Sequence, residues 1–96
     1  MFCYKIHETQ FGNLIAICDK EIKGKSLDNK GIEFFVNPRF YCEKLIGKEI
    51  LDIIPKVSDG NAIGNKIVDL LLNSEIISQK NIILIDGIKH AQFTIL

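Results

Sequence analysis

Cys18, Asp19 and His90 are the residues that most invite a catalytic interpretation. A cysteine thiol beside an imidazole can act as a nucleophile with its general base. Cys18 ends one apolar segment and His90 begins another, so neighbouring strand ends could bring them together. The structural alternative carries more weight, because a free cysteine is commonly a small buried apolar side chain. Asp19 would then cap a turn, and His90 would bond to nearby backbone.

Histidine and carboxylate side chains also raise the question of a metal site. His7 supplies a second imidazole, and two histidines with Asp19 would form a minimal ligand set. These residues sit on separated segments, without the short ligand spacing of a metal motif. We therefore expect no metal and no cofactor.

A small basic loop beside two aromatic residues indicates a binding role. Lys20, Lys23 and Lys25 lie close together in the sequence, and Phe40 and Tyr41 follow further along. Aromatic rings near lysines can stack on RNA bases while the lysines contact phosphates. The structural alternative is a solvated loop with both aromatic rings packed in the core.

Polar residues beside strongly apolar segments suggest a groove. Asn61, His90 and Gln92 would line one if they cluster, and such a groove suits recognition as well as catalysis. Together with the basic loop they define the predicted binding surface, which consists of Asp19, Lys20, Lys23, Lys25, Tyr41, Asn61, His90 and Gln92.

Two glycines lie four residues apart in a segment that we predict to be helical. Glycine costs about 1 kcal/mol relative to alanine inside a helix, so Gly64 needs a reason. Close packing against this face is one reason, with Gly60 on the same side. Access of an anion to the start of the helix is the other, but Asp59 would repel an anion there.

Hydrophobic periodicity predicts the elements that must position these residues. Alternation predicts strands at 2–7 and 90–96, and apolar runs predict strands at 14–18, 32–36 and 82–85. The runs 14–18 and 82–85 are apolar on both faces and are expected inside the sheet. Helices are predicted at 47–54 and 60–73, and a loop at 19–30. The expected fold is α+β, a mainly antiparallel five-stranded sheet with two helices packed on one face.

The amino-acid composition is that of a globular protein. The 96 residues are 47% hydrophobic and 25% charged, which predicts a single domain over residues 1–96. The formal net charge is zero, unlike that of a non-specific nucleic-acid binder, and it does little to oppose formation of a homodimer. Neither a signal peptide nor a membrane-spanning stretch is expected, and a cytoplasmic protein without membrane contact is predicted.

The cysteines point to the same compartment. Cys3, Cys18 and Cys42 are odd in number, widely spaced and free of any CxxC pair. A disulfide framework is therefore not expected, and all three are predicted to be reduced thiols.

Several segments together resemble a known family. They are residues 16–25, Phe40-Tyr41, residues 61–64 and residues 90–92, and their order resembles an archaeal family described only as domain of unknown function 424. The resemblance implies an archaeal cytoplasmic protein of α+β fold and implies no reaction. The chain departs from the expected pattern at Lys89, where we expect proline, and at Cys42, where we expect glycine.

The sequence thus favours a non-enzymatic binding module for RNA or an RNA–protein assembly. One alternative is a small enzyme that uses Cys18 and His90. Another is a protein–protein adaptor that pairs through an exposed edge strand, for which the C-terminal strand is the expected edge.

Overall fold

The alternating N-terminal segment forms the hairpin around which the sheet is built. In the computed structural model, which describes residues 1–95, β1 (Phe2–Thr9) pairs antiparallel with β2 (Gly12–Asp19). The pairing runs from Phe2 opposite Asp19 to Thr9 opposite Gly12. The strands predicted at 2–7 and 14–18 are confirmed. β2 is apolar on both faces because it lies inside the sheet, between β1 and β6.

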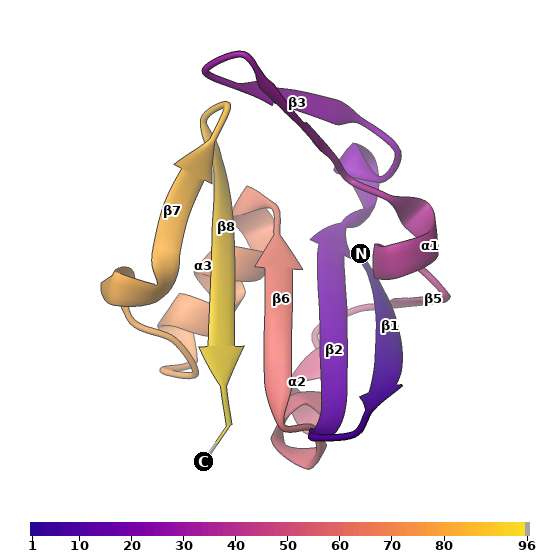
Figure 1. Ribbon diagram of the computed structural model, residues 1–96. Coiled ribbons are helices and arrows are strands. Elements are labelled where there is room, and N and C mark those ends of the chain that lie inside the picture. Colours follow the sequence, from indigo (N-terminus) through magenta and orange to yellow (C-terminus); the bar gives the residue numbers. More distant parts are fainter. Residues whose placement is uncertain (96) are drawn as a thin grey trace.

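The central sheet has six strands in the order β5-β1-β2-β6-β8-β7 (Figure 1). β2 and β6 run parallel, and the other neighbours are antiparallel. The predicted α+β class is correct, but the sheet is mixed and has one strand more than the five expected. The remaining strands of this sheet are β5 (Lys44–Ile46), β6 (Asp59–Ile63), β7 (Ile82–Ile85) and β8 (Ile88–Thr94).

The helix predicted at 60–73 is wrong in its first third. Residues 59–63 form strand β6, and α3 (Asn65–Asn73) begins only after Gly64. Ala62 and Ile63 are buried on opposite sides of β6, a pattern too short to recognise as a strand in the sequence. Gly60 lies in the strand, where the Phe93 ring packs against its backbone. The two glycines therefore share no helix face.

The segment between β2 and β6 contains more structure than the sequence indicated. The predicted loop at 19–30 contains the turn η1 (Lys20–Ile22) and strand β3, and the strand predicted at 32–36 is β4. β3 (Ser26–Asn29) and β4 (Ile32–Phe35) form a separate two-stranded sheet. After β4 the chain forms the short helix α1 (Pro38–Tyr41), which Asn37 caps. The helix predicted at 47–54 is shorter, α2 (Ile50–Ile53), followed by η2 (Ile54–Lys56).

The C-terminal hairpin reverses the predicted positions of its two strands. β7 was expected inside the sheet and lies at its edge, whereas the C-terminal strand was expected as the edge and lies inside as β8. The turn η3 (Gln79–Asn81) leads into β7. Strand order depends on which partner each strand finds in three dimensions, which the apolar run 82–85 does not encode. The predicted final residue of β8, Leu96, lies outside the described residues.

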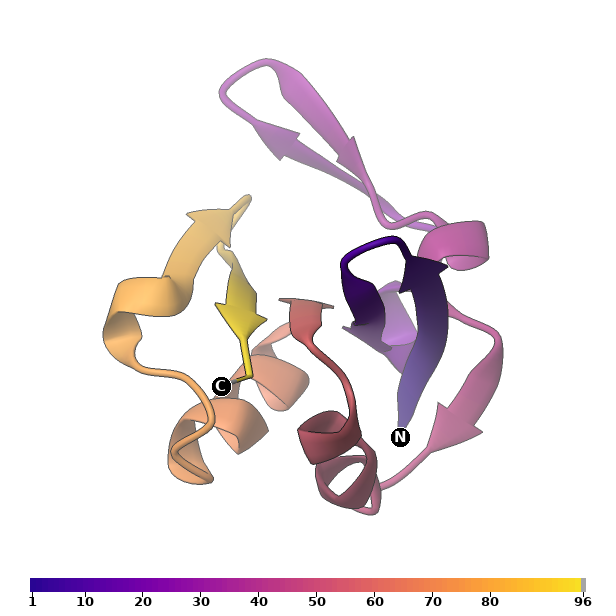
Figure 2. The ribbon, with the colours of Figure 1, turned by 60° about the horizontal axis from the view of Figure 1, so that its bottom comes forward.

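The sheet buries an apolar cluster on each face. Figure 2 shows α2 and α3 on one side of the sheet and the β3–β4 hairpin and α1 on the other. Helices α2 and α3 cover one face through a cluster that includes Ile17, Ile54 and Ile67. The β3–β4 hairpin and α1 partly cover the other face through a cluster that includes Cys18, Val36 and Tyr41. We call this second side the hairpin face. None of the helices within residues 1–95 is long and apolar enough to cross a membrane.

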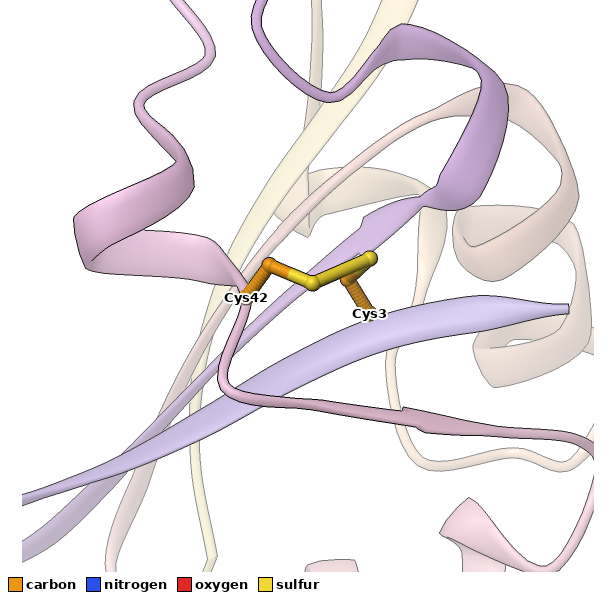
Figure 3. The surroundings of a disulfide bond; sticks show 2 residues. All are labelled: Cys3 and Cys42. Atoms are coloured by element: carbon orange, nitrogen blue, oxygen red, sulfur yellow. A yellow bond between two sulfur atoms is a disulfide. The ribbon is translucent and has the colours of Figure 1, made fainter.

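A disulfide joins Cys3 of β1 to Cys42, the residue that follows α1 (Figure 3). The prediction that all three cysteines are reduced thiols is wrong for this pair. β1 pairs with β5, and Glu43 N–H donates to Tyr4 C=O, which brings the two Cα atoms to 4.7 Å. A sequence separation of 39 residues gives no hint of this proximity. Cys18 is free and buried.

Candidate binding site on the hairpin face

A hydrogen-bonded cluster of three side chains lies on the hairpin face. Tyr41 O–H donates to Asn61 Oδ1 over 2.6 Å, and His90 Nε2 lies 3.2 Å from the same oxygen. Burial raises the pKa of Tyr41, so the phenol keeps the proton that it donates. The residues come from α1, β6 and β8, which are far apart in the sequence.

His90 is held as a neutral imidazole. Its side chain is buried, and this desolvation lowers its pKa from the usual 6.5. The neutral tautomer that carries the proton on Nε2 can donate to Asn61 Oδ1. The edge of Phe34, from the β3–β4 hairpin, packs on the imidazole with ring centroids 5.6 Å apart.

Gln92 extends this cluster toward the sheet edge. It lies directly opposite Asn61 in the β6–β8 pairing, on the same face of the sheet, and its side chain is exposed. A small pocket of about 220 Å³ opens beside it, lined by Asn81, Ile83, His90 and Gln92. We call Tyr41, Asn61, His90 and Gln92 the polar cluster. The structure therefore brings together four of the eight predicted site residues.

Asp19 does not belong to the polar cluster. Its carboxylate accepts hydrogen bonds from the backbone N–H groups of Lys66 (3.0 Å) and Ile67 (2.9 Å), at the start of α3. Burial raises its pKa, and the two N–H groups partly offset that increase. Gly64 has a φ of 128°, and a Cβ there would overlap the Asp19 carboxylate. Asp19 is thus a cap supplied by a distant strand, and it occupies the position that an anion would take at this helix start.

The three lysines lie apart from the polar cluster. Lys20, Lys23 and Lys25 are exposed in the loop that follows β2. This loop is fixed to the segment after β4, because Gly24 N–H donates to Val36 C=O and Val36 N–H donates to Lys25 C=O. It lies beyond the upper end of β2 in Figure 1, on the side of α1.

Cys18 and His90 do not form a nucleophile–base pair. Cys18 is opposite Ile63 in the β2–β6 pairing, and Ile63 is opposite His90 in the β6–β8 pairing, so a whole strand separates them. Two strand spacings place their Cα atoms roughly 10 Å apart. Burial raises the pKa of Cys18 to about 12, which leaves a protonated and unreactive thiol near neutral pH.

Lys5 was not predicted as a site residue, and the stacking of His7 on Phe40 was not predicted either. Lys5 lies in one row with Ala16, Asn61 and Gln92 across four adjacent strands, and its Nζ donates to Arg39 C=O over 3.2 Å. The His7 and Phe40 rings stack at 4.7 Å, and His7 Nε2 lies 2.8 Å from Phe40 C=O. The alternation at 2–7 already placed Lys5 and His7 on one face. Only the sheet order reveals that this face carries Asn61.

No group of three or more histidine, cysteine, aspartate or glutamate side chains within residues 1–95 is arranged to hold a metal ion.

The chain is similar to a known protein family and to one solved structure. The family described as "Protein of unknown function (DUF424)" matches residues 6–96. The chain belongs to the DUF424 family. No curated protein matches it. A crystal structure of an uncharacterized conserved protein from Methanopyrus kandleri is similar, with a TM-score of 0.77 and 22% sequence identity, over 99% of this chain and 91% of that one. At this level of identity the likeness shows a shared fold alone.

Lys89 and Cys42, where proline and glycine were expected from the sequence, both make specific bonds. Lys89 N–H donates to Asn65 Oδ1 over 2.9 Å, a bond that proline could not make. Its Nζ also forms an ion pair with Asp69 at 2.6 Å. Cys42 forms the disulfide with Cys3, which glycine could not do. In this chain Lys89 therefore attaches α3 to the sheet, and Cys42 attaches the end of α1 to β1.

Proposed function

We propose that this DUF424 protein is a non-enzymatic binding module whose hairpin face takes single-stranded RNA, either free or within an RNA–protein assembly. The observation that carries the proposal is the row of Lys5, Asn61 and Gln92, which crosses the sheet and ends at the pocket. Such a row offers a cation at one end and amide groups at the other. The amides suit base edges, and the lysine suits phosphate.

The pocket suits one flat ring. Its volume of about 220 Å³ is below the usual range for a whole drug-sized ligand. Ile83 gives it an apolar wall, while Gln92 and His90 give it polar groups. Because His90 is hydrogen-bonded to Asn61, which is itself held by Tyr41, the imidazole presents the same orientation to each ligand. An unpaired base of RNA has the shape and the hydrogen-bonding edge that this site would recognise.

The flanking lysines would contact the phosphate backbone. Lys5 lies in the row itself, and Lys20, Lys23 and Lys25 lie in the loop beyond the upper end of β2 (Figure 1). A chain of zero net charge has no broad basic field, so binding through these few lysines would be modest in strength and sensitive to salt.

The groups that could serve catalysis are already occupied. The Cys18 thiol is protonated near neutral pH, and the Asp19 carboxylate caps α3. The His90 imidazole is neutral and hydrogen-bonded to Asn61. This arrangement favours recognition over acid–base or nucleophilic chemistry.

The test is a fluorescence-anisotropy titration of labelled single-stranded RNA of mixed sequence at physiological salt, with DNA of the same sequence for comparison. The double variant Lys23→Glu/Lys25→Glu should bind at least about tenfold more weakly and with a shallower salt dependence. Gln92→Ala should weaken binding about fivefold and leave the salt dependence unchanged. The matched control Lys48→Glu/Lys56→Glu makes the same charge change at exposed positions around α2, and should bind within about twofold of the wild type.

Absence of RNA binding by the folded wild type at physiological salt would contradict the proposal. Equal loss in the control variant would show attraction by charge alone, without a site on the hairpin face. Retention of full affinity by Gln92→Ala would remove the pocket from the proposal.

A further inference from the structure

The Cys3–Cys42 disulfide lies next to the polar cluster in the chain. Cys42 directly follows Tyr41, whose O–H donates to Asn61 Oδ1 over 2.6 Å. Cys3 lies near the start of β1, so the disulfide ties the end of α1 to the central sheet (Figure 3). The position of Tyr41, and with it the hydrogen bond that holds Asn61, therefore depends on a covalent link one residue away.

The helix that carries Tyr41 has little stability of its own. α1 has four residues, and a helix this short does not persist without tertiary contacts. Besides the disulfide, two side chains of β1 hold its backbone. Lys5 Nζ donates to Arg39 C=O over 3.2 Å in an exposed bond, and a partly buried bond joins His7 Nε2 to Phe40 C=O at 2.8 Å. Because such hydrogen bonds are individually weak, the disulfide is the strongest attachment of this helix.

The three cysteines differ in their access to solvent. Cys3 and Cys18 are fully buried on the hairpin face, opposite each other in the β1–β2 pairing, whereas Cys42 is half-buried. Burial raises the pKa of Cys18 to about 12, so its protonated thiol does not attack the neighbouring disulfide near neutral pH. The disulfide is therefore stable to internal exchange, and a thiol reagent from solvent reaches it at Cys42.

We infer that the Cys3–Cys42 disulfide is a redox switch. A dithiol reductant opens it at Cys42, and the opening loosens α1 and the hold of Tyr41 on Asn61. One thiolate of the reductant attacks Cys42 Sγ, the S–S bond breaks, and Cys3 leaves as a thiolate that takes up a proton. The second thiol of the reductant then attacks the mixed disulfide and frees Cys42. The reductant is thereby oxidised to a disulfide, and the protein takes up the electrons and protons that the reductant loses.

The reduced protein keeps its fold and loses only the fixed position of α1. β1 remains paired with β2 and β5, and the apolar cluster under α2 and α3 contains no cysteine. Lys5 and His7 still hold α1 near the sheet, so Tyr41 becomes mobile without leaving the hairpin face. The consequence for RNA rests on the proposed function: a polar cluster that is less fixed binds its ligand more weakly.

The first test is NMR spectroscopy of the isotope-labelled full chain before and after reduction with dithiothreitol. Backbone order parameters of Tyr41 and Cys42 should fall from about 0.85 toward 0.6, and the side-chain amide signals of Asn61 should shift. The amide signals of α3, on the other face of the sheet, should keep their positions. Cys42→Ser should match the reduced wild type with or without dithiothreitol. The matched control Cys18→Ala removes the free thiol and keeps the disulfide, so it should respond to reduction as the wild type does.

Two further measurements test the access to the disulfide and its link to the polar cluster. In the folded, reduced chain, iodoacetamide should modify Cys42 at least about tenfold faster than Cys18. Reduction should weaken RNA binding by the wild type about threefold. It should change binding by Tyr41→Phe less than about 1.5-fold, because that variant already lacks the hydrogen bond to Asn61.

Order parameters at Tyr41 and Cys42 that stay unchanged on reduction would overturn the inference. A reduced chain that unfolds would also overturn it, because the disulfide would then serve the whole fold. Equal weakening of RNA binding in the wild type and in Tyr41→Phe would contradict the link to Asn61. A reduced protein with a mobile α1, whose oxidised form binds no RNA, would leave this inference standing while the proposed function failed.

Discussion

Asp19 caps the start of α3, and we expect its removal to lower the stability of the fold. In Asp19→Ala the backbone N–H groups of Lys66 and Ile67 lose their acceptor. The hydrogen bond to the Ile67 N–H is buried, so leaving that group without a partner costs about 1–3 kcal/mol. Lys66 is exposed, and water can replace its partner at a cost of roughly 0.5 kcal/mol. Removal of a buried carboxylate, whose pKa is raised by desolvation, offsets part of this loss.

The expected result is a loss of about 2 kcal/mol in the free energy of unfolding, or roughly 8–16 °C in Tm for a domain of this size. Asp19→Asn should lose less, about 1 kcal/mol, because one oxygen still accepts and no charge is buried. Urea denaturation followed by circular dichroism measures both variants. The matched control is Asp52→Ala, which removes an exposed aspartate from the first turn of α2 and should change stability by less than about 0.5 kcal/mol.

A loss in Asp19→Ala no larger than that in Asp52→Ala would refute this reasoning. It would mean that α3 begins without help from β2. A larger loss in Asp19→Asn than in Asp19→Ala would also refute it, since an acceptor oxygen at this position would then be of no benefit to the two N–H groups.

Three further outcomes are expected. Burial lowers the pKa of His90 in the folded protein, so the neutral side chain contributes its full share of the free energy of unfolding above pH 6.5, and this share is lost as the pH falls below that value. Denaturation at several pH values should therefore show a steeper loss of stability with falling pH for the wild type than for His90→Gln. Alkylation of the denatured, unreduced chain should label Cys18 alone, and Cys42→Ser should lower the free energy of unfolding by about 3–4 kcal/mol because a separation of 39 residues is no longer closed. Gly64→Ala should lower the free energy of unfolding by about 2 kcal/mol or more, because it strains a residue at positive φ and crowds the Asp19 carboxylate. Thermal unfolding measures this loss, and a clearly smaller one would contradict the close approach of Gly64 to Asp19.

The local parts of the fold could be predicted from the residues themselves. Alternation at 2–7 and the apolar run at 14–18 identified the first hairpin, because period two is a property of the strand alone. The helical spacing of Ile67 and Leu71 identified the body of α3 for the same reason. The strand at 59–63 was missed because it contains only two buried apolar residues. Neighbouring strands β2 and β8, distant in the sequence, hold it in place.

The candidate site was decided mainly by tertiary structure. Residue types alone selected Tyr41, Asn61, His90 and Gln92, but only the sheet order brings β6 beside β8 and Tyr41 across β2. Because of this strand order, Asp19 lies at the start of α3 and outside the polar cluster, Cys3 is bonded to Cys42, and one strand separates Cys18 from His90.

By itself, the sequence determined which segments bury apolar side chains and where the chain turns, because those properties depend on residues a few positions apart. Only the tertiary structure decided which polar groups meet. Contacts between strands far apart in the chain depend on the order in which the strands pair, and no local spacing records that order.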